Sequence, residues 1–433
     1  MRLCLIASKP TDSVMLGFLP AAARLGLEVV LLTDQPEEHE RARARSRPLA
    51  RPGCPRPAPE HDDPGPASDG PPVRFIGCDV WDTRELVPAI AALPAPHAIV
   101  SNSDHLQAQT ALAAEYFGLP GKDWRSALRA KNKSLMRRRL AESGTEQVGA
   151  ALIRAGDEPP DGLRYPVVLK PAEGVASEDV VLVRDPEELA VRSARILARR
   201  PGEALLAEEY LPGGLHTLET LGDGKQTWVL GGFRTTLSPL PYFIEERLTW
   251  DAPAPDPARE HVLGALGALG VTFGACHTEY VDGALGPALI EVNDRLIGDH
   301  CDFVLSDLLG VDLFDLVLRV HLGESLPAEP PRPADGTECS AGGTAHAVID
   351  YVVADRPGTL AAVPPAGPRL TGDKDVRLSF RPLRAPGDRI VITHTNRDYL
   401  GVISAIGPDA ATVERAVAAA RAAEEWPVTE VRR

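Results

Sequence analysis

The chain has 433 residues, of which 44% are hydrophobic, and it carries a formal net charge of −15. This length supplies enough apolar side chains for two or three domains, and the acidic balance excludes a non-specific nucleic-acid surface. No apolar run approaches membrane-spanning length, and the N-terminus has the pattern of a strand and not of a signal peptide. Six scattered cysteines without CxxC spacing indicate buried thiols, so we expect a cytoplasmic protein with no nucleic-acid or membrane partner.

The first part of the chain alternates between strand-like apolar runs and helical patterns. LCLIAS, a helix through MLGFLPAAARLG, and LEVVLLTD predict one βαβ unit, and the same rhythm continues afterwards. We therefore expect an open parallel sheet in an α/β domain over residues 1–125. Within it, residues 35–72 are crowded with Pro, Arg and Gly, which predicts a mobile surface insertion without a core.

Two lysines stand out in the segment that follows, residues 126–323, which we expect to form a central domain. Lys133 begins an apolar-periodic helix that Gly144 closes, and Lys170 ends the buried-strand pattern VVLK immediately before a loop. A lysine at a strand end often only extends its amine to solvent, and Lys133 alone is equally compatible with a solvated charge. The neighbouring Lys131 is not a candidate ligand.

The loop after the second lysine reads AEGVASEDVVLV and contains a single glycine. Its backbone N–H groups from Gly174 to Ser177, and the Ser177 hydroxyl, are candidates to bind phosphate. Glu178 and Asp179 would repel a triphosphate unless they face away from it. Further along, the helical run HVLGALGALG is predicted to use its glycines for close packing.

Residues 278–300 contain two apolar-patterned runs around the turn DGALGP, which predicts an antiparallel hairpin. In such a hairpin Glu279 lies across from Glu291, and Asn293 and Arg295 project from the same face as Glu291. Mg²⁺ takes oxygen ligands of this kind, and Mn²⁺ is an alternative. Polar residues on the wet face of a hairpin are the competing interpretation. The ordered set is rarer by chance, so it predicts a metal site at Glu279, Glu291 and Asn293 with Arg295 beside it.

The run EVNDRLIGDH resembles the E-[IV]-N-x-R signature of the ATP-grasp ligases, and Glu279 matches the upstream magnesium ligand of that family. The resemblance covers roughly residues 1–320 in order, and it implies that ATP is bound. It implies phosphate contacts for Lys133 and Lys170. In AEEYLPGGLHTLE it implies an adenine contact for Glu208, a hinge backbone contact for Leu211 and a ribose contact for His216. The glycine-poor loop departs from the family pattern.

The resemblance implies a carboxylate–amine ligase that forms an acylphosphate and ADP, with Arg295 stabilising the acylphosphate and the amine adduct. The HTE run and the C-terminal strands suggest the amino-acid ligases that make dipeptides or intermediates of siderophores and antibiotics. The expected partners are small-molecule carboxylates and amines, and a homodimer is an open alternative. Another ATP-grasp chemistry (carboxylation or purine synthesis), a regulatory protein without catalysis, and a plain small-molecule-binding protein are the competing functions.

Substrate contacts are the least determined part of the sequence. Asp299 and His300 follow Arg295 on a loop that either faces the acyl pocket or caps the next helix, and the sequence does not decide between these. Arg234 and Arg247 flank a Pro-rich loop, and each is a candidate to bind a substrate carboxylate. His277 is expected to be structural. A Pro-rich stretch then predicts a boundary before a small C-terminal α+β domain over residues 324–433, so the expected fold is a multidomain α/β and α+β chain.

Overall fold

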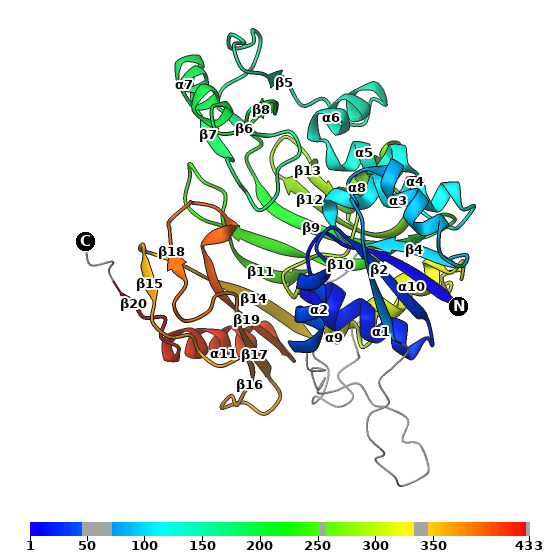
Figure 1. The fold of residues 1–433 in the computed structure, drawn as a ribbon. Coiled ribbons are helices and arrows are strands. Elements are labelled where there is room, and N and C mark those ends of the chain that lie inside the picture. Colours follow the sequence, from blue (N-terminus) through cyan, green and yellow to red (C-terminus); the bar gives the residue numbers. More distant parts are fainter. Residues whose placement is uncertain (46–71, 252–255, 333–344, 430–433) are drawn as a thin grey trace.

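The structure is a computed structural model that describes residues 1–45, 72–251, 256–332 and 345–429 (Figure 1). Its N-terminal part is a parallel four-stranded sheet in the order β3-β2-β1-β4. The strands are β1 (Arg2–Ile6), β2 (Glu28–Thr33), β3 (Val73–Gly77) and β4 (Ala98–Ser101). Alternate side chains of β1 enter different cores, because successive residues of a strand point to opposite faces. This sheet confirms the expected open parallel architecture.

Helices cover both faces of this sheet, which is why β1, β2 and β4 are apolar and buried over most of their length. They are η1 (Ser13–Phe18), α1 (Leu19–Arg24), α3 (Thr83–Ala91), η2 (Asp104–Leu106) and α4 (Gln107–Tyr116). The expected insertion at 35–72 begins differently, since α2 (Pro36–Arg45) is a helix. Its proline at the first position, acidic first turn and basic last turn all favour a helix, and its buried His39 packs beside Thr33 at the end of β2. Residues 46–71 lie outside the described residues.

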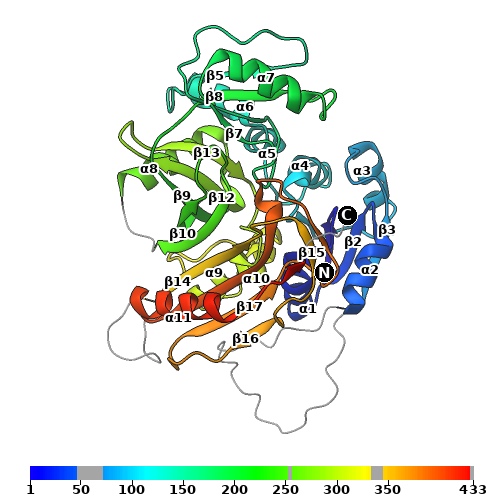
Figure 2. The same ribbon diagram turned by 90° about the vertical axis from the view of Figure 1, so that its left-hand side faces the viewer.

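A second, smaller sheet stands apart at the top of Figures 1 and 2. It is antiparallel, with the order β5-β8-β6-β7, and α7 packs on it. Its elements are β5 (Ala150–Ile153), β6 (Val167–Pro171), β7 (Val181–Val183), α7 (Pro186–Leu197) and β8 (Leu205–Glu209). Two helices, α5 (Trp124–Lys131) and α6 (Lys133–Glu142), precede it in the chain.

The largest sheet has nine strands in the order β13-β12-β9-β10-β11-β14-β19-β17-β16. They are β9 (Gly214–Asp223), β10 (Thr227–Leu237), β11 (Glu245–Asp251), β12 (Phe273–Asp282), β13 (Ala288–Asn293), β14 (His346–Val353), β16 (Gly367–Arg369), β17 (Arg377–Pro382) and β19 (Tyr399–Gly407). β14 pairs with β11, so the C-terminal strands continue the sheet of the central segment. The division into domains at residues 125 and 323 stays a prediction.

The remaining elements surround this sheet. They are α8 (Pro257–Leu269), α9 (Cys301–Leu309), α10 (Leu313–His321), β15 (Gly358–Leu360), β18 (Arg389–Ile390), η3 (Asn396–Asp398), α11 (Ala410–Ala423) and β20 (Val428–Thr429). α9 and α10 join the N-terminal and nine-stranded sheets in one apolar core, in which Phe314 meets Phe18 at 5.1 Å between ring centroids. Every helix within the described residues is too short or too polar to cross a bilayer.

The glycines of α8 do not serve the close packing expected of them. Gly264 and Gly267 lie on the exposed side of the helix, and a Cβ at either position would meet no heavy atom within 4 Å. The helix instead packs through apolar residues on its buried side, among them Val262, Leu266 and Leu269. The close approaches occur in the nine-stranded sheet, where a Cβ on Gly232 would lie 1.9 Å from the Thr217 carbonyl oxygen.

Candidate active site

The predicted metal hairpin forms from β12 and β13, with Glu279 opposite Glu291 and His277 opposite Asn293. Glu279, Glu291, Asn293 and Arg295 all line one cavity of 230 Å³, which we call the metal cavity. Within the described residues no cluster of three or more His, Cys, Asp or Glu side chains forms a metal cage. Two carboxylates and one amide fit Mg²⁺, which keeps water and phosphate oxygens as its other ligands.

The two predicted phosphate lysines are buried beside acidic side chains and do not extend to solvent. Lys133 opens α6 after the capping residue Asn132, and its Nζ lies 2.8 Å from Glu291 Oε1. Lys170, at the end of β6, is 4% exposed and pairs with Glu208. Burial and the neighbouring cations lower the pKa of Lys170 and outweigh the opposing effect of Glu208. Both amines are therefore held where an anionic ligand would gain most from them.

The other lysines nearby hold structural carboxylates. Lys131 pairs with Asp104, and Lys122 Nζ lies 2.8 Å from Asp294 Oδ1. Lys131 is thereby engaged at the edge of the N-terminal sheet, in line with its exclusion as a phosphate ligand.

Glu208 is the centre of a buried ion-pair network. Arg137 Nε lies 2.9 Å from its second oxygen, and Arg137 also binds Glu146 at 3.0 Å. Burial would raise the pKa of Glu208, but Arg137 and Lys170 outweigh burial and hold that pKa at about 2. Glu208 is therefore ionised, and it accepts hydrogen bonds from both cations.

The cavity beside these lysines, which we call the nucleotide cavity, has a volume of 320 Å³. Ser177, Glu208 and Leu211 line it, together with apolar side chains that include Val168, Leu237, Phe243 and Ile290. A cavity lined by apolar side chains together with the two lysines suits a nucleotide base and its phosphates.

Three of the predicted contact residues, His216, Arg234 and Arg247, lie outside the cavities of the site. On β9 it is Leu215 that lines the nucleotide cavity, and His216 points to the other face because side chains alternate along a strand. The His216 ring stacks on Tyr280 at 5.5 Å. Arg234 sits opposite His216 on β10, is exposed, and is absent from the lining of the cavities described here. Arg247 is bound to Asp350 and Glu414 and is not free for a substrate.

The phosphate loop, residues 172–180 between β6 and β7, takes an unusual backbone path. Ala176, Ser177 and Asp179 have φ values of 56°, 53° and 56°, in the left-handed region that side chains disfavour. The Ser177 hydroxyl donates to the Phe243 carbonyl at 2.9 Å, and the backbone N–H of Asn396 donates to the Ala176 carbonyl at 3.1 Å. Glu178 and Asp179 are paired with arginines, which resolves the charge conflict predicted for this loop.

A third cavity of 640 Å³, the sheet-edge cavity, lies at the carboxyl ends of β1 and β4. Open parallel sheets bind ligands at this edge. Arg295, Asp299 and His300 line it. The residue before α9 is His300, without a side-chain cap, so Asp299 occupies the pocket position and does not cap the helix.

His300 is held in place by a neighbouring acid from the N-terminal segment. Its Nε2 lies 2.6 Å from Asp12 Oδ2, and Arg381 of β17 pairs with the same carboxylate. Burial alone would raise the pKa of Asp12, but His300 and Arg381 outweigh burial and lower it. One carboxylate thus joins the N-terminal sheet, the loop after Arg295 and the C-terminal strands.

Glu245 and Asn396 are site residues that sequence reasoning missed. Glu245 lines both the nucleotide and the metal cavity, and Asn396 Nδ2 donates to its Oε1 at 3.0 Å. Burial, and then the charge of Glu279, raise the pKa of Glu245 to about 8. No motif surrounds either residue, and the only signal was the position of Glu245 directly after a Pro-rich loop.

His277 supports the metal hairpin from within the sheet, as expected of a structural residue. Its Nδ1 lies 2.8 Å from Glu219 Oε1 and its Nε2 lies 3.5 Å from Glu279 Oε1. Burial would lower the pKa of His277, but Glu219 and Glu279 outweigh burial and raise it to about 10. A protonated imidazole therefore bridges the two carboxylates and fixes the position of Glu279.

Comparison with known proteins gives sequence relatives of low identity. No protein-family model matches the chain. It is 28% identical over 342 residues to the uncharacterized protein y4rH of Sinorhizobium fredii, which spans 76% of this chain and 68% of that protein. It is 24% identical over 310 residues to dapdiamide A synthase of Enterobacter agglomerans, which spans 68% of this chain and 71% of that enzyme.

Solved structures agree over nearly the whole chain. An L-amino acid ligase from Bacillus licheniformis superposes with a TM-score of 0.75 at 20% identity and covers 99% of both chains. A biotin carboxylase domain from Hydrogenobacter thermophilus, in complex with MgADP, has a TM-score of 0.65 at 16% identity and covers 99% of this chain and 90% of its own.

The chain therefore has the fold of the ATP-grasp ligases. These similarities confirm the expected mixed α/β fold and the resemblance read from the hairpin motif. ATP and Mg²⁺ are the ligand pair typical of this fold, and the converging oxygens of the metal cavity and the two buried lysines fit them.

Proposed function

We propose that this protein is an ATP- and Mg²⁺-dependent carboxylate–amine ligase that forms an amide bond and releases ADP. The observation that supports this most directly is the continuity of the three cavities. Glu279 and Glu291 line both the nucleotide and the metal cavity, and Arg295 and Asp299 line both the metal and the sheet-edge cavity. ATP in the nucleotide cavity would therefore face a substrate carboxylate in the sheet-edge cavity, with the predicted metal ligands between them.

The side chains have complementary roles in this proposal. Lys133 and Lys170 offset phosphate charge, and Glu279, Glu291 and Asn293 hold Mg²⁺, which when bound neutralises phosphate oxygens. A substrate carboxylate attacks the γ-phosphorus of ATP, so that an acylphosphate forms and ADP leaves. An amine then attacks the acyl carbon and displaces phosphate. Arg295 is positioned to stabilise the charge on the acyl group through both steps, by positioning and electrostatics rather than by covalent chemistry.

Amino acids, or an amino acid and a polycarboxylate, are the substrates that we infer. The sheet-edge cavity carries both signs of charge, which suits a zwitterion, since its lining includes Lys9 and Arg295 as well as Asp12, Asp104 and Asp299. Similarity to an L-amino acid ligase and to dapdiamide A synthase supports the same class. Secondary-metabolite or siderophore biosynthesis in the cytoplasm is the setting that we propose.

The test is a screen for ADP release over pairs of amino acids and polycarboxylates, with mass spectrometry of the products. We expect ADP release to require both an acid and an amine, and a new amide to appear with a loss of one water. With hydroxylamine in place of the amine, a hydroxamate of the acid should form. ADP release that responds to bicarbonate and never yields an amide or hydroxamate would instead favour a carboxylase, whose fold this chain shares.

A further inference from the structure

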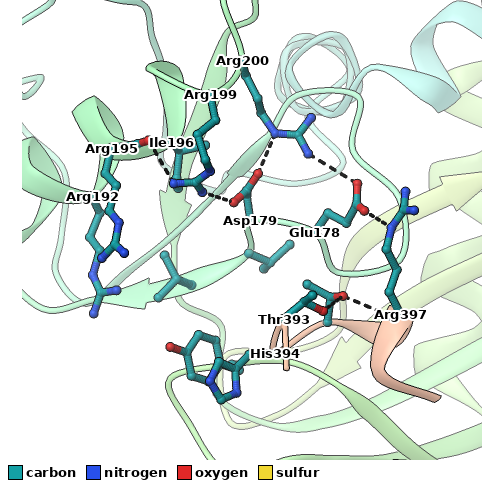
Figure 3. Close-up of a pocket in the computed structure, with 14 residues that line it drawn as sticks. Glu178, Asp179, Arg192, Arg195, Ile196, Arg199, Arg200, Thr393, His394 and Arg397 are labelled. Atoms are coloured by element: carbon teal, nitrogen blue, oxygen red, sulfur yellow. Dashed lines mark hydrogen bonds and ion pairs between the residues drawn. The ribbon is translucent and has the colours of Figure 1, made fainter. Parts of the chain in front are cut away.

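A fourth cavity lies behind the phosphate loop and outside the three cavities of the proposed active site (Figure 3). This rear cavity has a volume of 540 Å³, and its walls come from residues 178–181 of the loop and β7, from α7 with residues 199 and 200 after it, and from residues 393–397. Val180 lines both the rear and the nucleotide cavity. The phosphate loop is therefore a wall that the two cavities share.

The rear cavity is strongly basic within an acidic protein. Five arginines line it, against two carboxylates from the loop: Arg192, Arg195, Arg199, Arg200 and Arg397 face Glu178 and Asp179. One wall is closed by the stacked rings of Tyr242 and His394, which lie 4.2 Å apart at an angle of 5°. Several guanidinium groups in one concave pocket suit an anion with carboxylate or phosphate groups, which Arg binds through paired hydrogen bonds.

Some of this charge is compensated within the protein. Asp179 lies 2.6 Å from both Arg199 and Arg200, and Glu178 pairs with Arg397 and lies 3.4 Å from Arg200 (Figure 3). These pairs tie the strained phosphate loop to α7 on one side and to the C-terminal segment on the other.

The other two arginines, Arg192 and Arg195, make no ion pair with the carboxylates of the loop. Arg192 reaches Glu188, one turn earlier on α7, at 3.3 Å, and Arg195 makes no side-chain hydrogen bond or ion pair with the part of the chain that the structure describes. Arg192 and Arg195 are three residues apart on α7, a spacing at which like charges destabilise a helix. The helix dipole favours cations near the C-terminal end of α7. It does not explain why these arginines line the same cavity as Arg397, which comes from a distant segment of the chain.

We propose that the rear cavity binds a small polyanion, a phosphorylated or multiply carboxylated metabolite, which controls the phosphate loop. The anion would accept hydrogen bonds from Arg192 and Arg195 and compete with Glu178 and Asp179 for the other guanidiniums. Because the loop holds left-handed residues that need external contacts, loss of its ion pairs loosens it and weakens nucleotide binding. By thermodynamic linkage, a bound nucleotide lowers the affinity of the rear cavity for the anion by the same factor.

Binding is tested by calorimetric titration of inorganic pyrophosphate into the full chain. The buffer is free of Mg²⁺ and of nucleotide and has constant ionic strength. We expect saturable binding to the wild type, a loss of roughly tenfold or more in Arg192→Ala/Arg195→Ala, and wild-type binding in the control Arg84→Ala/Arg319→Ala. The control removes the same charge from exposed arginines outside the cavity. No saturable binding, or an equal loss in both variants, would overturn the proposal.

Two further measurements test the competition with the loop. Asp179→Asn should bind pyrophosphate more tightly than wild type, because Arg199 and Arg200 lose an internal partner. Pyrophosphate should weaken ADP binding to wild type but not to Arg192→Ala/Arg195→Ala. If pyrophosphate weakens ADP binding equally in wild type and in this variant, it competes directly with ADP in the nucleotide cavity, and the proposed regulatory role is wrong. Neither measurement depends on ligase activity, so the outcome is independent of the proposed function.

Discussion

At the scale of single residues, each buried cation of the site already holds a carboxylate. Lys133 binds Glu291, Lys170 binds Glu208, and protonated His277 bridges two further acids. Leaving one member of such a pair alone in a buried place is costly, which is why these side chains keep their positions without a ligand. The site is thus pre-organised electrostatically, and substitutions in it will affect both binding and stability.

Glu291→Gln should abolish ADP formation, because it removes a charged predicted metal ligand. It also leaves the buried Lys133 without its acid, so we expect a loss of stability of about 1–3 kcal/mol with the fold retained. A coupled ADP assay and thermal unfolding followed by circular dichroism measure both effects. Glu324→Gln, at an exposed ion pair, is the matched control and should be neutral. Normal turnover of Glu291→Gln at millimolar Mg²⁺ would contradict the metal assignment.

Arg295→Ala should keep near-normal ATP affinity and lose amide formation by about 100-fold or more, since a contact made in the transition state lowers kcat more than it changes binding. Arg295→Lys should recover only part of this loss, because a point charge does not reproduce a planar donor. Single-turnover kinetics with a separate titration of a non-hydrolysable ATP analogue distinguish the two quantities. A variant that loses ATP affinity and keeps its kcat would place Arg295 in nucleotide binding instead.

The candidate site was only partly predictable from the sequence. The metal hairpin was predictable, because a turn motif and the two-residue period of strands place Glu279 opposite Glu291. His216 was misplaced because the resemblance assigned a contact without deciding which face of β9 it occupies. Glu245 and Asn396 were missed because their approach depends on β14 and β19 joining the sheet, which is a pairing between distant segments without a local signal.

At the scale of elements, α8 contains two exposed glycines that lower its helix stability. Gly264→Ala and Gly267→Ala should each stabilise the protein by about 0.5–1 kcal/mol, because alanine restricts the unfolded chain and meets open space in the helix. Chemical denaturation measures the gain. Gly232→Ala is the contrasting variant and should be strongly destabilising, since its Cβ would collide with the Thr217 carbonyl. Destabilisation by either helix substitution would show that α8 packs more closely than described.

α9 begins with a buried acid that makes stability depend on pH. Burial, opposed by the Ser13 hydrogen bond, raises the pKa of Asp302 to about 6, well above the usual value of an aspartic acid. The folded state therefore binds the proton more tightly than the unfolded state, and this contribution is present at low pH and is lost as pH rises from about 4 to 6.

Asp302→Asn mimics the neutral form, and we expect it to be more stable than wild type above pH 6 by up to about 3 kcal/mol. At pH 4 the two proteins should differ little. Urea denaturation across this range tests the sign. A constant difference between the proteins from pH 4 to 8 would mean that Asp302 does not titrate in this window.

At the scale of the whole molecule, the nine-stranded sheet crosses the predicted boundary near residue 323. The α/β rhythm of the N-terminal part was predictable from local periodicity, and so were the long strands β9, β10, β12, β14 and β19. β11 and β17 were not predicted, and the expected strand DRIVITHT is only the two-residue β18. The join between β11 and β14 was not, because the Pro-rich stretch SLPAEPPRPADG suggested a separate domain. Arg247 crosses this join to bind Asp350, which adds an ion pair to the ladder.

The groups of strands that exchange hydrogen together should therefore differ from the domains predicted from the sequence. We expect β14 and β19 to exchange together with β9, β10 and β12, and the small sheet of β5–β8 to open independently at lower free energy. Mass spectrometry of proteolytic peptides over a denaturant series resolves the two groups. If residues 345–429 exchange as a unit before the rest of the large sheet, the C-terminal segment is an autonomous domain after all.

The ion-paired lysines also determine how the protein can be handled chemically. The chain has seven lysines, and four of them hold carboxylates at Asp104, Glu208, Glu291 and Asp294. The other three, Lys9, Lys225 and Lys374, are exposed. An amine that is paired and enclosed is a poor nucleophile, so among the lysines acylating dyes and amine-coupling surfaces will react with these three in preference to the other four. Of the three, only Lys9 lines a cavity of the site, so replacing it with arginine gives a protein that can be tethered or labelled with its catalytic centre untouched.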